Sequence, residues 1–143
     1  MARAEAGKGL LLVHPALWYN WQEWPEYNQK LVAGGARSHD KFGEFEVTVV
    51  DREHPITKGL PEKFLITDEL YHHKKDTSGP PIEVLAVGRN LQTGQTYPVV
   101  WITKSPNSHI VCITLGHDEK SHTLPEFQTL LVNAHEWARG AKK

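Results

Sequence analysis

The sequence predicts an α/β domain, and three observations carry that prediction. Residues 10–14 and 109–115 are apolar runs that end at or just before a histidine, His14 and His117. Residues 99–102 form a continuous apolar run, which is typical of a strand covered on both faces. Near the C-terminus, apolar residues recur at the spacing of an amphipathic helix. The elements are therefore mixed, with more strands than helices.

Each remaining element is predicted from a local pattern. A short helix begins at Pro25, runs to residue 33 and ends at Gly34 and Gly35. Residues 54–61 form a turn. The predicted strands are residues 10–14, 45–50, 64–67, 69–72, 82–87, 97–103 and 109–115. With only two good helices, either some of these strands are antiparallel hairpins or part of the sheet is absent.

The C-terminal helix has the clearest signals. Thr123 and Glu126 match a capping box, Pro125 suits the first turn, and Gly140 suits the end. One face of this helix carries Phe127, Leu130, Leu131, Ala134 and Trp137.

The composition limits the classes of protein to which this chain can belong. The 143 residues fit one domain, residues 1–143. The net charge is −1 and the basic residues form no run, which argues against nucleic acid and membrane surfaces as partners. The polar opening predicts no signal peptide, and a single cysteine, Cys112, fits a cytoplasmic protein without disulfides. The nine histidines stand out in this composition, and they bear on function because histidine is the commonest metal ligand.

Several motifs in order match one family. They are residues 7–14, 27–35, 38–39, 54–61, 67–71, 98–101, 115–117 and 133–138. The chain resembles the ThuA-like (trehalose utilisation) domain of the class I glutamine-amidotransferase-like superfamily. The resemblance implies a flavodoxin-like three-layer domain with a mixed, mainly parallel sheet. It also implies that the N-terminal βα units of the family are lacking. The surface left by this truncation predicts a homo-oligomer, a dimer or higher.

The resemblance also locates candidate site residues. The elbow that carries a cysteine nucleophile in the amidotransferases carries His14 here, and His117 takes the place of the later histidine. Without a thiol at the elbow, the chain is not expected to be a glutamine amidotransferase. Cys112 lies within an apolar strand and is expected to be buried and inert.

Histidines and one carboxylate form the predicted centre of the site. The catalytic candidates are His14, His117 and Glu69. With His39, the same residues are a plausible ligand set for a divalent metal, zinc first. They are equally plausible as a general acid–base set without metal. Asp68 is expected to make a turn or to accept hydrogen bonds from backbone N–H groups.

Aromatic residues supply candidate substrate contacts. The expected substrate-binding residues are Trp18, Tyr19, His39, Tyr71 and Trp101. The aromatic stretch after His14, which includes Trp21 and Trp24, suits either the stacking of sugar rings or an oligomer interface. By resemblance, the protein is expected to act on disaccharides or 3-keto-sugar derivatives, as a hydrolase or isomerase. The alternatives are a non-catalytic binding or interaction domain, or a fragment whose activity arises at a new oligomer interface.

Overall fold

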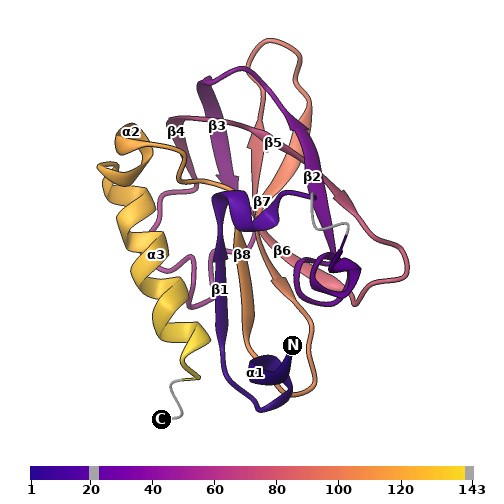
Figure 1. Ribbon diagram of the computed structural model, residues 1–143. Coiled ribbons are helices and arrows are strands. Elements are labelled where there is room, and N and C mark those ends of the chain that lie inside the picture. Colours follow the sequence, from indigo (N-terminus) through magenta and orange to yellow (C-terminus); the bar gives the residue numbers. More distant parts are fainter. Residues whose placement is uncertain (20–22, 141–143) are drawn as a thin grey trace.

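A six-stranded sheet with helices on both faces forms the body of the protein (Figure 1). The computed structural model describes residues 1–19 and 23–140. The strand order is β1-β8-β7-β6-β3-β4. The bounds in that order are Leu10–Val13, Ile110–Ile113, Thr96–Thr103, Ile82–Arg89, Gly43–Val49 and Lys63–Asp68. A second sheet pairs β2 (Gly34–His39) with β5 (Tyr71–Lys75) in antiparallel fashion. The α/β class and the mixed sheet agree with the sequence prediction.

The directions of the strands differ from the mainly parallel sheet that was expected. In the six-stranded sheet only β1 and β8 pair in parallel, and the other four pairs are antiparallel. The physical reason lies in the connections, because a parallel pair needs a crossover of a dozen or more residues. Residues 90–95 join β6 to β7 and residues 104–109 join β7 to β8, so both connections are too short for a crossover.

Two apolar cores lie on opposite faces of the sheet. One lies between the sheet and α3 (Pro125–Ala138) and includes Phe127 and Leu130. The other packs Trp101 and Cys112 against Leu17, Leu31 and Val32. Full burial of one such side chain contributes about 1.5–3 kcal/mol. The two cores hold the sheet rigidly between its helices, which provides a firm base for loops at the strand ends.

Short helical segments flank the sheet. They are α1 (Ala2–Glu5), the 3-10 segment η1 (His14–Leu17), the π-helical segment η2 (Tyr27–Val32) and α2 (Glu119–His122). η2 corresponds to the helix predicted over residues 25–33, and it ends at Ala33, whose φ is 57°. No helix among the described residues is long and apolar enough to span a membrane.

The capping box predicted at Thr123 is wrong. Leu124 is the N-cap of α3 and provides no side-chain cap, while the Thr123 hydroxyl donates to the carbonyl of Glu119 in the preceding helix. Pro125 does occupy the first turn, as predicted. The capping box belongs instead to α2, where Asp118 and Ser121 satisfy each other's backbone N–H groups. This cap fixes the chain immediately after His117.

Candidate functional site

His14 lies at the end of β1 in a backbone conformation that non-glycine residues rarely adopt. Its φ is 48°, and only 7% of the residue is exposed. The Nδ1 atom lies 2.9 Å from the carbonyl oxygen of Thr114, and a carbonyl only accepts, so Nδ1 carries the proton. In the neutral ring the lone pair is therefore on Nε2, which faces the site. Strained backbone at such a position is common where a side chain must be aimed.

A buried carboxylate holds the loop that carries His117. Asp68 is fully buried at the end of β4 and accepts hydrogen bonds from the backbone N–H groups of Gly116 (2.7 Å), His117 (3.2 Å) and Glu69 (2.7 Å). Gly116 has a φ of 115°, which favours glycine, and an added Cβ would lie 2.9 Å from Phe127. Asp68 therefore accepts backbone N–H groups, as the sequence analysis expected, and it links the β8 loop to Glu69.

Three side chains meet at this point. The Nε2 atom of His14 is 3.2 Å from Nδ1 of His117 and 3.7 Å from Oε2 of Glu69. The same Glu69 oxygen is 3.1 Å from Nδ1 of His117. These ligand atoms all lie within 4.8 Å of one another. His14 and Glu69 are largely buried, whereas His117 is more open to solvent. The cluster is therefore accessible from one side.

The geometry of this cluster fits a divalent metal ion. Ligand atoms about 2.0–2.2 Å from zinc on neighbouring vertices are about 3–3.5 Å apart, close to the three separations seen here. Two imidazoles and one carboxylate are a common donor set for zinc and for iron. The Thr114 carbonyl orients the His14 ring in the way that outer hydrogen bonds orient metal ligands. Without metal, His117 Nδ1 lies close enough to both Glu69 Oε2 and His14 Nε2 to exchange a proton with either.

Tyr71 and Trp18 border the cluster. The Tyr71 hydroxyl is 3.2 Å from His14 Nε2 and can donate its proton to that lone pair. Burial, with the charges of Glu69 and Asp68, raises the pKa of Tyr71 to about 12, so the hydroxyl stays protonated near neutral pH. The ring of Trp18 lies edge-on to Tyr71 (5.3 Å between centroids) and to His39 (5.8 Å).

His39 approaches the cluster from β2 without joining the three converging ligand atoms. Its Nδ1 donates to the carbonyl of Asp40 at 2.7 Å and is 3.7 Å from Oε1 of Glu69. Among the described residues, the group of three or more metal-ligating side chains contains His14, Glu69 and His117 only. His39 therefore lies beside Glu69, on the rim of the site.

Comparison with known proteins identifies the family. The family model for ThuA, described as trehalose utilisation, matches residues 1–138. The chain belongs to the ThuA family. This agrees with the resemblance carried by the sequence motifs.

Solved structures of ThuA-like proteins have the same fold. A ThuA-like protein from Parabacteroides merdae ATCC 43184 superposes with a TM-score of 0.83 at 23% identity, covering 99% of this chain and 63% of the other. A ThuA-like protein from Bacteroides uniformis ATCC 8492 superposes with a TM-score of 0.79 at 25% identity, and the match covers 97% of this chain and 61% of the other. This ThuA chain therefore spans about three fifths of the length of these neighbours. No curated protein matches it.

Two of the predicted substrate contacts of this ThuA protein lie elsewhere. Trp101 is fully buried, and its indole N–H donates to the carbonyl of Val32, so Trp101 is a core residue and the prediction is wrong. The register of β7 explains this, because Trp101 pairs with Cys112 on the face away from α3. Tyr19 stacks under the guanidinium of Arg37 at 4.0 Å, in a separate hollow beside β2 and β5.

The rest of the aromatic stretch does not reach the cluster in the part of the chain described. Trp24 packs against Tyr27, and Trp21 lies outside the described residues. Cys112 is buried as predicted. Burial raises the pKa of its thiol to about 12, outweighing a hydrogen bond with Thr103, so it is not a nucleophile.

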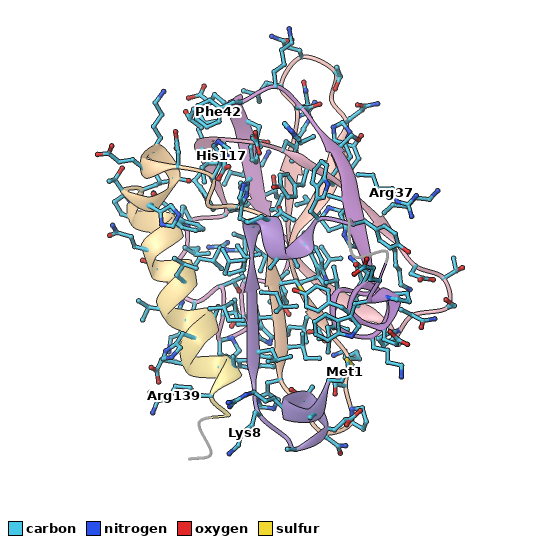
Figure 2. All side chains as sticks on the ribbon, viewed as in Figure 1. Met1, Lys8, Arg37, Phe42, His117 and Arg139 are labelled. Carbon is cyan, nitrogen blue, oxygen red and sulfur yellow. The ribbon has the colours of Figure 1, made fainter. Side chains whose placement is uncertain are left out.

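One residue beside the ThuA site was missed by the sequence analysis. Phe42 is 39% exposed, and its ring lies 5.5 Å from that of His117 (Figure 2). No sequence pattern marks Phe42 as a site residue, because it is a single aromatic residue between Lys41 and Gly43 in the turn that precedes β3. An exposed aromatic ring beside a polar cluster suits ligand contact.

Proposed function

We propose that this ThuA-family protein is a metal-dependent enzyme acting on carbohydrate derivatives, disaccharides or 3-keto sugars. A single divalent ion, zinc first, is held by His14, Glu69 and His117. The observation that carries the proposal is the convergence of one carboxylate oxygen and two ring nitrogens within 4.8 Å at the end of the parallel strand pair. The family description, trehalose utilisation, supports the substrate class.

The side chains around this ion have different roles in the proposed reaction. A bound divalent ion would polarise a sugar carbonyl or lower the pKa of a water molecule. Tyr71 stays protonated and acts as the proton donor next to His14. Trp18 offers an aromatic wall for a sugar ring, and His39 offers Nε2 as an acceptor, since its Nδ1 proton is donated to Asp40.

The same contacts also support a second candidate, an acid–base mechanism that needs no metal. The Tyr71 hydroxyl, His14 Nε2, His117 Nδ1 and Glu69 Oε2 are linked in series by separations of 3.1 to 3.2 Å. Such a series moves a proton between a base and an acid. In this second candidate, Glu69 acts as the base rather than as a ligand.

Sugar conversion tests the proposed function directly. Untagged protein loaded with zinc or manganese is incubated with trehalose and with its 3-keto derivative, and the sugar resonances are followed by proton NMR. We expect conversion of at least one sugar, lowered at least 100-fold in Glu69→Gln and Tyr71→Phe. Val132→Ala, at a 62% exposed position on α3, is the control and keeps full activity. No conversion of either sugar under either metal would contradict the proposal.

A further inference from the structure

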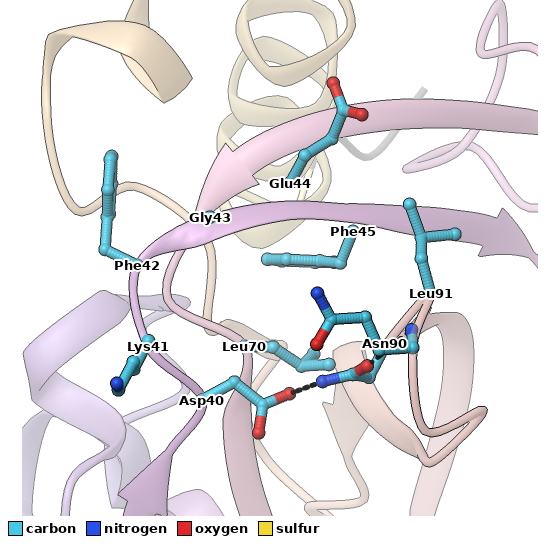
Figure 3. A pocket seen from close by; sticks show the side chains of 10 residues that line it. Asp40, Lys41, Phe42, Gly43, Glu44, Phe45, Leu70, Asn90 and Leu91 are labelled. Atoms are coloured by element: carbon cyan, nitrogen blue, oxygen red, sulfur yellow. Dashed lines mark hydrogen bonds between the residues drawn. The ribbon is translucent and has the colours of Figure 1, made fainter.

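A cavity of about 530 Å³ is lined in part by Phe42, whose ring lies 5.5 Å from that of His117; Figure 3 shows the lining residues. This volume lies within the range of about 300–1,000 Å³ that is usual for small-molecule sites. Phe42 lines the cavity and also contacts the ring of His117. Leu70, another lining residue, stands between Glu69 and Tyr71 in the chain. Phe42 is therefore shared by the cavity and the edge of the cluster.

The lining combines apolar surface with polar groups of both signs. Phe45 and Leu70 are buried beneath it, while Phe42 and Leu91 are exposed apolar side chains beside it. The polar lining residues are Asp40, Lys41, Glu44, Asn90 and Gln92. Because neither charge dominates, the lining does not select an anion or a cation. Apolar surface combined with scattered hydrogen-bonding groups suits a neutral ligand that has apolar faces and many hydroxyls.

Asp40 is fixed in place as an acceptor at this cavity. Oδ1 accepts from Nε2 of His72 at 2.9 Å, and Oδ2 accepts from Nδ2 of Asn90 at 2.6 Å. The Asn90 amide is itself oriented, because its oxygen accepts the backbone N–H groups of Gln92 and Thr93. Partial burial raises the pKa of Asp40, but the hydrogen bonds from Asn90 and His72 outweigh it and lower the pKa overall. An ionised carboxylate keeps further lone pairs for ligand hydroxyls.

We propose that this cavity is a second sugar subsite, so that the protein takes a glycoside of two rings. One ring lies at the cluster of His14, Glu69 and His117, and the other lies against Phe42 with its hydroxyls toward Asp40. This inference rests on the proposed function for its choice of ligand. It adds the place of the second ring and the residues that contact it.

Titration with one-ring and two-ring sugars tests the subsite. The ¹⁵N-labelled, zinc-loaded protein is titrated with trehalose and with glucose while two-dimensional NMR spectra are recorded. We expect trehalose to bind at least tenfold more tightly than glucose. We also expect trehalose to shift the Asn90 side-chain amide and the Gln92 backbone amide. Saturable shifts confined to residues near His14 and His117, or no saturable shift, would overturn the subsite.

Variants separate the subsite from the metal centre. Leu91→Ala removes an exposed apolar side chain from the lining and is expected to weaken trehalose binding about threefold while leaving glucose affinity and zinc content unchanged. Val132→Ala is the matched control on α3. Equal trehalose affinity in the two variants would overturn the inference. Trehalose shifts at Asn90 in protein that binds no zinc would uphold the subsite and contradict the metal centre instead.

Discussion

Replacing Asp68 with alanine removes the acceptor of three backbone N–H groups at the site. Two of the hydrogen bonds, from Glu69 and Gly116, are 2.7 Å long, and the third, from His117, is 3.2 Å. A hydrogen bond to a charged group contributes about 1.5–3 kcal/mol, and Asp68 is fully buried. Counting the two short bonds, we expect Asp68→Ala to lower the free energy of unfolding by about 3–6 kcal/mol.

Urea unfolding followed by tryptophan fluorescence measures this loss. The midpoint should fall with little change in the slope of free energy against urea, which shows that stability and not compactness has changed. Asp118→Ala is the matched control, because Asp118 caps α2 in the same loop and such a cap contributes about 1 kcal/mol. A loss in Asp68→Ala no larger than that in Asp118→Ala would refute the assignment of Asp68 as the anchor of the His117 loop.

Three further outcomes are expected. His73 is 8% exposed, neither ring nitrogen has a partner among the described residues, and burial lowers its pKa from 6.5 to about 4. Between those pH values the unfolded chain binds a proton that the folded chain does not. Stability should therefore fall by about 3 kcal/mol as the pH drops from 7 to 4, and His73→Phe should flatten this dependence; an unchanged pH dependence in the variant would count against it. Cys112 should not react with Ellman's reagent at pH 8 until the protein unfolds, because burial raises its pKa to about 12; reaction of the folded protein would disagree. β1 is an edge strand of half-buried apolar residues, Leu10–Val13, so sedimentation velocity should detect a dimer or higher oligomer, and a monomer at all concentrations would end that prediction.

Elements with strong apolar patterns were predictable from the sequence. The apolar strands and the C-terminal helix appear where their patterns indicated, because burial on the sheet dictates those residues. β2 was missed, since the segment Gly34–His39 is rich in glycine and polar residues and pairs with β5 through its backbone. The strand directions were misjudged because they depend on which distant strands pair. Apolar periodicity does not encode that choice.

The site was predictable in part for the same reason. His14 and His117 follow the two strands that pair in parallel, so the apolar runs indicated a strand end for each, whereas their convergence was expected from the family resemblance. The position of Glu69 beside them depends on β4 and β5, which pair in different sheets, and its choice rested on family resemblance. Trp101 was misassigned because an aromatic residue in a central strand gives no sign of which face it occupies.

Metal analysis of untagged protein tests the central claim most directly. We expect about one zinc or similar divalent ion per chain after loading and dialysis, and none in the His14→Ala/His117→Ala double variant. The double variant His109→Ala/His135→Ala also removes two histidines, both exposed and outside the cluster, and should bind as much metal as the parent. No bound metal in the parent, or equal metal in all three proteins, would contradict a metal centre at His14, Glu69 and His117.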